Sequence, residues 1–253
     1  MRRTELAYTA RGGWVALRRL TGHDEESIEE VSTAGAIALV DRLLVAAPGA
    51  ALGPGEAARL TAADRDRILA DLHVAELGAK VESTLACGAC GTAIDVDFQL
   101  PALLAAAERD TTQAVDEEGT ALLPDGRRIR LPTGADELAV AAAADPEAEL
   151  LRRCSVDGTA CDAATAAAAL ERVAPLLDVD LDAACPECGA ATALRFDAQE
   201  FVLERLLADR DARTREVHSL ARAYHWPLHE ILGLSRQQRK LHVALVDSER
   251  AMR

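Results

Sequence analysis

Two Cys-x-x-Cys pairs separated by ninety-four residues constrain this chain more than any other feature. The pairs are Cys87 with Cys90 and Cys185 with Cys188, and a glycine directly follows each pair. Two intervening residues let both sulfur atoms face one tetrahedral metal ion, and glycine suits the tight turn behind them. Four thiolates are the usual ligand set of a structural zinc ribbon. The sequence therefore predicts one Zn²⁺ per chain, held by all four cysteines.

The separation between the two pairs is unusual for a zinc ribbon, in which about 15–20 residues normally lie between the knuckles. Here a segment of subdomain size is inserted, so the metal would join distant parts of the chain. A Cys₄ site leaves no position for water or substrate, so we expect the metal to be structural and not catalytic. A redox-active dithiol and a pair of structural disulfides are the alternatives.

The charge of the chain is strongly negative and unevenly distributed. Its 253 residues carry a net charge of −14, which argues against non-specific nucleic-acid binding because such binding depends on Lys and Arg. Residues 213–253 contain eight Lys or Arg and four Asp or Glu, so the preceding 212 residues carry −18. This asymmetry predicts a basic C-terminal module on an acidic body.

The chain shows no sign of secretion or membrane insertion. Its N-terminal residues lack the apolar stretch of a secretory signal, and no apolar run reaches membrane-spanning length. Paired Cys-x-x-Cys motifs without a signal are typical of metal binding in a reducing cytosol. We therefore expect a soluble cytoplasmic protein.

Apolar periodicity and capping residues predict an α+β protein that is mainly helical, with a split Cys₄ zinc ribbon and a helical C-terminal module. Extended segments are expected on both sides of the first cysteine pair and after the second, at 80–85, 93–100 and 192–196. Hairpins are expected within 4–20 and 121–131. A helix is expected from an N-cap at Thr21 or Asp24 to about 47, and the segment 131–137 is expected to repeat this arrangement of a strand end followed by a capped helix. Further helices are expected at 61–77, 101–107, 147–154, 163–177, 197–224 with a bend near 209–213, 228–233, and from Ser235 onward.

These elements divide the chain into four expected parts. They are an N-terminal part of a hairpin and two helices (1–78), the split ribbon (79–100 and 182–197), an inserted hairpin-and-helix subdomain (101–181), and a helical C-terminal docking module (198–253).

The C-terminal module is the second informative stretch. A helix break there carries the run Tyr224, His225, Trp226 and Pro227, and the last helix brings Arg236, Arg239 and Lys240. Aromatic and arginine-rich amphipathic segments are good protein-docking elements, so these seven residues are the candidate partner-binding residues. A helical hairpin that merely closes the core is the alternative interpretation.

The remaining candidates favour ordinary structural roles. Cys154 and Cys161 could supplement the metal site, but isolated cytosolic cysteines are more often small buried apolar residues. Four of the six histidines lie in the C-terminal segment without metalloprotease spacing, so packing or capping is expected of them. The chain has no phosphate-binding loop, nucleophile elbow or dinucleotide fingerprint, and we expect it not to be an enzyme.

Several short motifs together resemble one known family. The segment Leu-Ala-x-x-Tyr-His-Trp-Pro-Leu-x-Glu-Ile-Leu-x-Leu (220–234), followed by an Arg-rich helix, is similar to the C-terminal module of baseplate-hub assembly proteins of contractile tails. Leu-Thr-Gly-His-Asp-Glu (20–25), Asp-Val-Asp-Phe (95–98) and Arg-Leu-Pro-Thr-Gly-Ala-Asp (130–136) resemble the long, zinc-ribbon-bearing members of that group. The family serves T-even-type phages and related phage-tail-like injection systems.

The resemblance implies a non-enzymatic assembly factor, chaperone or minor component of the baseplate hub. It implies hub, baseplate or spike proteins as partners, no nucleic-acid, membrane or small-molecule partner, and possible incorporation into the assembled particle. A zinc-ribbon adaptor in transcription or RNA metabolism is the alternative, which the acidic body disfavours. A redox or hydrolytic enzyme that uses the thiols is a third hypothesis, and it requires an open or reactive site.

Overall fold

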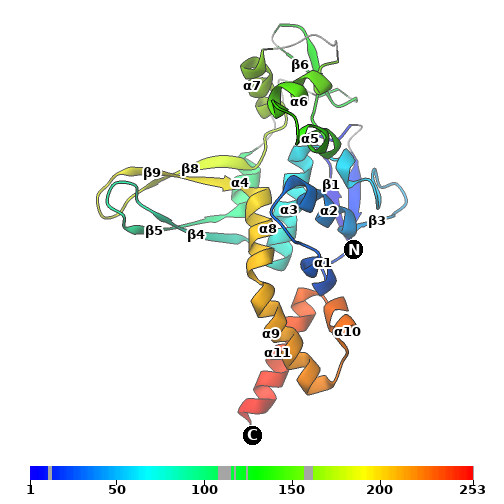
Figure 1. The fold of residues 1–253 in the computed structure, drawn as a ribbon, viewed down its shortest axis with the longest axis vertical. Helices are drawn as coiled ribbons and strands as arrows, with labels where there is room; N and C mark the ends of the chain where they lie inside the picture. The colour runs from blue at the N-terminus through cyan, green and yellow to red at the C-terminus, as the bar shows by residue number, and fades with distance from the viewer. Residues whose placement is uncertain (11–12, 108–114, 117, 124, 157–161, 253) are drawn as a thin grey trace.

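The computed structural model describes the whole chain except residues 11–12, 108–114, 117, 124, 157–161 and 253. Figure 1 shows a body from which an arm of two hairpins projects to one side and the C-terminal helices extend along the long axis. The strands are β1 (Arg2–Glu5), β2 (Trp14–Leu17), β3 (Leu44–Val45), β4 (Lys80–Ala86), β5 (Ala93–Gln99), β6 (Thr120–Leu122), β7 (Arg128–Arg130), β8 (Asp178–Ala184) and β9 (Ala191–Asp197). The helices are α1 (Gly22–Glu26), α2 (Thr33–Leu43), η1 (Ala57–Arg59), α3 (Ala62–Glu76), α4 (Leu100–Ala106), α5 (Gly134–Val140), α6 (Pro146–Cys154), α7 (Ala163–Val173), α8 (Ala198–Ala208), α9 (Arg210–Tyr224), α10 (Leu228–Gly233) and α11 (Arg236–Ala251).

The α+β prediction is confirmed, and the main core lies in the body. Strands β1, β2 and β3 form one antiparallel sheet, with Ala16 opposite Val45. Helices α2, α3 and α8 pack beside this sheet, and their apolar positions are almost fully buried, as the sequence periodicity predicts. This core is mainly aliphatic, so the body has its own source of stability. A separate cluster joins the base of the arm to α3 and α8, with Val81 and Phe196 packed against Ala70 and Ala198.

Thr21 is the N-cap of α1, as one of the two predicted alternatives had it, but the single helix expected from there to 47 is wrong, because the structure has two helices. Ser32 ends the intervening segment in an extended conformation, and its hydroxyl accepts a hydrogen bond from the Gly35 N–H at 3.0 Å. Ser32 is therefore the N-cap of α2, a role for which serine is well suited. At the other end Leu44 turns into β3 and pairs with Leu17, which stops the helix four residues early.

The arm consists of two hairpins that stack face to face. β4 pairs with β5 and β8 with β9 over seven residues each, and exposed residues alternate with more buried, mostly apolar ones along all four strands. At the base Phe98 and Phe196 meet edge to face, with ring centroids 5.0 Å apart. Strand β8 was not among the expected extended segments, because its Asp-Val-Asp-Leu-Asp stretch carries a pattern of exposed and half-buried residues that only pairing with β9 completes.

The inserted subdomain has its own small core, but that core also uses the N-terminal part of the chain. Buried residues of β6, β7, α6 and α7 surround Ile129, and Tyr8 and Ala63 join them from the first 78 residues. The Asp64 carboxylate fixes the loop that carries Tyr8, since it accepts hydrogen bonds from the backbone N–H groups of Ala7, Tyr8 and Thr9 at 2.6–3.0 Å. The insertion is therefore anchored on the body.

The two Thr-Gly motifs build the same structure twice. In the first, the Asp24 carboxylate accepts hydrogen bonds from the N–H and hydroxyl of Thr21 and forms an ion pair with Arg18 at 2.6 Å. In the second, Asp136 binds Thr133 and Arg130 in the same way, 112 residues later. Each motif thus caps a short helix and holds the preceding strand end to it.

Each Thr-Gly motif docks against a second capped helix. Thr21 forms a backbone bridge with Ser235, and Thr133 forms one with Thr61. A Cβ atom at Gly22 would lie 2.9 Å from the Leu232 Cδ2 atom and 3.0 Å from the Leu232 Cα atom, and one at Gly134 would lie 2.7 Å from the Ile37 Cδ1 atom, so a larger residue would force the neighbouring side chains to shift. The recurring Thr-Gly pair is thus explained by packing.

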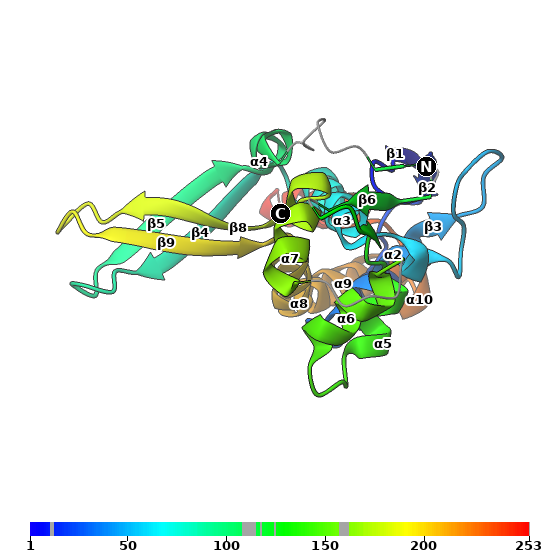
Figure 2. The same ribbon diagram turned by 90° about the horizontal axis from the view of Figure 1, so that it is seen from above.

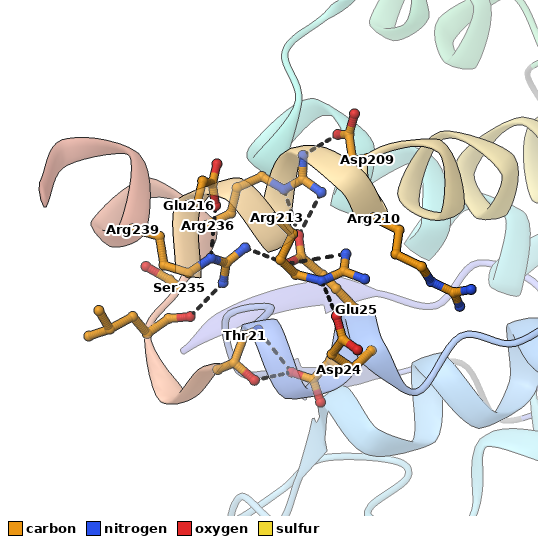
Figure 3. Close-up of polar contacts among 12 residues, drawn as sticks. Thr21, Asp24, Glu25, Asp209, Arg210, Arg213, Glu216, Ser235, Arg236 and Arg239 are labelled. Atoms are coloured by element: carbon orange, nitrogen blue, oxygen red, sulfur yellow. Dashed lines mark hydrogen bonds and ion pairs between the residues drawn. The ribbon is translucent and has the colours of Figure 1, made fainter. Parts of the chain in front are cut away.

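Both docking contacts are closed by a buried ion pair. Glu137 pairs with Arg65. Glu25, whose side chain is completely buried, pairs with Arg236 and Arg239 (Figure 3). The Arg213 guanidinium lies 3.9 Å from the same Glu25 carboxylate and binds Glu26 at 2.5 Å. Such pairs do little for stability relative to apolar packing, but losing one partner leaves a buried charge uncompensated.

The C-terminal module is a helical hairpin with a small core of its own. α9 and α11 pack together with α10 around Leu220, Ile231 and Val246. His225 ends α9 in the left-handed conformation (φ 57°), and Ser235 caps α11 with Gln238 as expected. None of the helices among the described residues is long and apolar enough to cross a lipid bilayer.

The buried carboxyl of Asp66 makes stability depend on pH. It accepts a hydrogen bond from the Leu177 N–H at 3.2 Å, and burial, opposed by Arg65, raises its pKa to about 7. The native state therefore binds this proton more tightly than the unfolded chain, so stability falls as pH rises between about 4 and 7.

The substitution Asp66→Asn tests this pH dependence, because the asparagine side chain keeps an acceptor for the Leu177 N–H. We expect the free energy of unfolding, measured in urea, to be roughly 2–4 kcal/mol higher for the variant than for the natural chain at pH 8, and equal for the two near pH 4. The exposed Asp247→Asn should show no such pH-dependent gain, and a gain of the same size at both pH values would contradict the account.

Candidate metal centre

The two cysteine pairs occupy the tips of the two arm hairpins. In the first tip the Gly91 N–H donates to the Cys87 carbonyl at 2.8 Å, and in the second the Gly189 N–H donates to the Cys185 carbonyl at 2.9 Å. Both glycines adopt positive φ, at 75° and 70°, which is why glycine follows each pair. The two turns are therefore equivalent, and each directs its thiols away from its own hairpin and toward the other.

The four sulfur atoms converge on one point, as predicted from their spacing. All four lie within 4.8 Å of one another, and the Sγ atoms of Cys87 and Cys188, and of Cys90 and Cys185, are 3.7 Å apart. A tetrahedron with metal–sulfur bonds of about 2.3 Å has sulfur–sulfur edges of about 3.8 Å. The cluster therefore has the size and donor chemistry for one metal ion, and it would take all of its ligands from this chain.

The surroundings of the thiols favour ionisation of the two cysteines at the first hairpin tip. Hydrogen bonds from the Cys90 and Ala89 backbone lower the pKa of Cys87, and the Thr92 side chain and backbone lower the pKa of Cys90 to about 6. At Cys188 the Ala190 N–H lowers the pKa, but hydrogen bonding with Cys90 and Cys185 outweighs it and raises the pKa to about 12. Four thiolates at this spacing repel one another, so full ionisation requires a bound cation.

The cluster is half open to solvent. Cys87 and Cys185 are 2% exposed and pack with Ile94, whereas Cys90 and Cys188 face outward. Figure 2 shows the arm from above, with the two tips far from the body. A metal ion would therefore join the ends of the two hairpins, while the body core lies elsewhere.

The other thiols and the histidines do not join the cluster within the described part of the chain. Cys154 is buried on α6 in the core of the inserted subdomain, where burial raises its pKa to about 11. Cys161 lies outside the described residues. The four cysteines form the one potential metal-binding group among the residues whose placement is described. Packing or capping thus remains the prediction for the histidines.

The candidate partner-binding residues separate into two groups. Tyr224 and Trp226 stack on each other with ring centroids 4.8 Å apart, and His225, Pro227 and Lys240 are exposed. Arg236 and Arg239 are only 4% and 1% exposed. Their prediction as surface residues needs correction, because they are used within the chain to bind Glu25, a residue that sequence reasoning did not single out.

Few of the basic side chains that give the C-terminal module its positive charge are left unbalanced on its surface. Among its described residues from 213 onward, the exposed charges are four bases and three acids: Arg215, Arg222, Lys240 and Arg250 against Glu230, Asp247 and Glu249. Its exposed surface is thus nearly neutral. What it does present is apolar, since Leu228, Leu241 and Leu245 are 58%, 60% and 48% exposed.

Comparison with protein-family models, curated proteins and solved structures found no match for this chain.

Proposed function

We propose that this protein is a non-enzymatic, cytoplasmic assembly factor for the baseplate hub of a contractile tail, with one structural zinc ion. The observation that carries the proposal is the C-terminal module, a separate helical hairpin that leaves large apolar side chains on its surface. Two of the sequence motifs that resemble hub assembly proteins lie in this module (220–234) and in the Thr-Gly segment docked to it (20–25), and the other two lie in β5 and in the second Thr-Gly segment. The resemblance supplies the kind of partner, and the exposed apolar residues supply a means of binding it.

Zinc is the proposed metal because it prefers a closed tetrahedral site of four thiolates and has no redox chemistry of its own. A closed Cys₄ site supports a structural role. Here the zinc ion would hold the two hairpins together at the tip of the arm, and it would take no part in a reaction.

Docking on the proposed partner uses Leu241 and Leu245, which lie one turn apart on α11 and are both exposed. An aliphatic pair of this kind is a suitable anchor for an apolar patch on a hub or baseplate subunit. The nearly neutral charge around it makes the contact depend on apolar burial more than on salt concentration.

The test is affinity capture from the native host with the full-length, metal-loaded protein. We expect hub, baseplate or spike subunits to be recovered, and we expect the double substitution of Leu241→Asp with Leu245→Asp to reduce recovery at least tenfold. Leu122→Asp, at a position on β6 that is 62% exposed, is the matched control and should leave recovery unchanged.

Other outcomes have defined meanings. Recovery of RNA polymerase or ribosomal proteins would replace the proposal with the transcription or RNA adaptor. The charge of the arm disfavours that function, since residues 80–99 and 178–197 contain eight acids and two bases. Equal loss of the tail subunits with the Leu122 variant would show that the C-terminal surface is not the binding site.

A further inference from the structure

The outer edge of β8 is an unpaired strand edge. β8 pairs only with β9 in a sheet of two strands, and no backbone hydrogen bond to its other side occurs among the described residues. Seven-residue edges without proline or a bulge can accept another strand, so natural proteins usually cover or protect them. The edge of β8 is therefore a surface that can add a strand.

The register identifies the groups that this edge presents. Hydrogen bonds between Cys185 and Ala190 at the tip, and between Ala198 and Leu177 at the base, fix the odd-numbered β8 residues as those that bond to β9. The N–H and C=O groups of the even-numbered residues 178, 180 and 182 consequently point away from β9. All three residues are aspartates with exposed side chains.

A cavity opens beside the start of the same edge. It has a volume of about 500 Å³ and is lined mainly by apolar side chains, including Leu170, Leu176 and Val179, with further lining from the start of α3 and from Leu131 and Pro132. Asp178 also lines it, but no residue of β9 does. The cavity therefore adjoins the first residues of β8, within reach of the end of a strand added to that edge.

The aspartates of the β8 edge determine which side chains an added strand should carry. An added strand would place alternate side chains opposite Asp178, Asp180 and Asp182, where Lys or Arg is favoured and acids are disfavoured. Asp178 is paired with Arg195 at 2.6 Å, and Asp180 lies across from the same arginine, whereas Asp182 lies across from Ala193. Toward the tip of β8, the negative charge is therefore the least compensated.

The same charges argue against two other occupants. A second copy of this chain that added β8 to β8 would oppose aspartate with aspartate, which destabilises strand pairing. Nucleic acid would meet an edge of its own charge. A partner strand with basic residues in alternation and an aliphatic residue at its end satisfies both the edge and the cavity.

We propose that the β8 edge binds an extended segment of a partner protein in which basic and aliphatic residues alternate, with a terminal aliphatic side chain seated in the cavity between α7 and β8. Backbone hydrogen bonds to the edge give this mode its affinity, and the aspartates and the cavity give it selectivity. The site is distinct from the C-terminal apolar surface, and the proposal does not depend on the assembly function.

The probe is the synthetic peptide Leu-Lys-Val-Lys-Val-Lys-Leu, which offers a leucine to the cavity in either strand direction. Its binding to the full-length, metal-loaded protein is followed by fluorescence anisotropy. We expect saturable binding that weakens roughly tenfold on combined Asp180→Lys and Asp182→Lys substitution. The matched control is Asp95→Lys with Asp97→Lys, two exposed aspartates of β5 that do not line this cavity, and it should bind the peptide as the natural chain does.

Two further comparisons separate strand addition from simple charge attraction. Ala167→Trp should fill the mouth of the cavity and weaken binding, whereas Ala168→Trp, at an exposed neighbour that does not line the cavity, should not. Methylating the peptide nitrogens that face the edge should abolish binding, because it removes the donors that the β8 carbonyls require. Equal weakening by the β5 and β8 variants, or binding that survives methylation of all peptide nitrogens, would overturn the proposal. So would a self-association of the chain that the peptide displaces, since the edge would then belong to a second copy.

Discussion

Removing the metal with a chelator is expected to unfold the arm while the body remains folded. Two-stranded hairpins are marginally stable in water, and the arm tip has only a small cluster around Cys87, Ile94 and Cys185 to replace the metal. Amide hydrogen exchange at 85–94 and 183–192 should accelerate by roughly a hundredfold, because local opening then costs little. Exchange in α2, α3 and α8 should change little, since these helices belong to the body core.

Single-site variants sharpen this prediction. Cys185→Ser removes one thiolate ligand and should reproduce the effect of the chelator in the arm. Cys154→Ser is the matched control, because Cys154 is equally buried but lies in the inserted subdomain, so metal content and arm protection should be unchanged. Uniform loss of protection across body and arm would contradict the division of the molecule into separate cores.

Replacing Glu25 by glutamine is expected to detach the C-terminal module. The Glu25 side chain is wholly buried, and three arginine side chains that are at most 5% exposed depend on its charge. Losing one partner of such a network typically costs about 3–5 kcal/mol, because the remaining charges stay buried without compensation. Limited proteolysis should then cleave the chain between α8 and α9 faster than in the natural protein, and urea unfolding should show a separate early transition.

The control for this substitution is Glu29→Gln, which makes the same chemical change at an exposed position four residues later. It should alter stability by less than about 0.5 kcal/mol. If Glu25→Gln were equally mild, Glu26, Asp209 and Glu216 would be sufficient for the arginines, and Glu25 would not be the centre of the docking contact.

Local chemistry explains why the cysteine cluster was predictable from the sequence. The two-residue spacing and the following glycine determine each tip within a few residues, so four converging thiols could be expected without knowing the rest of the fold. Helix caps at Thr61 and Ser235 were predictable for the same reason, because each capping hydroxyl accepts a hydrogen bond from the backbone N–H three residues later.

Long-range contacts explain what the sequence could not show. Arg236 and Arg239 look like surface residues of an amphipathic helix, and their partner Glu25 lies more than two hundred residues away. The β8 strand was predicted only as a lead into the second cysteine pair. Its cross-strand partners and the neighbouring cavity appear only when the inserted subdomain is in place.

X-ray absorption spectroscopy at the zinc edge, on the full-length protein as isolated, tests the central claim most directly. The account predicts one zinc per chain with four sulfur neighbours at about 2.3 Å and no oxygen or nitrogen ligand. It also predicts loss of this signal in Cys87→Ser and its retention in Cys154→Ser. A site with fewer than four sulfur ligands, or one that keeps its full sulfur shell without Cys87, would contradict a metal centre closed by the two hairpin tips.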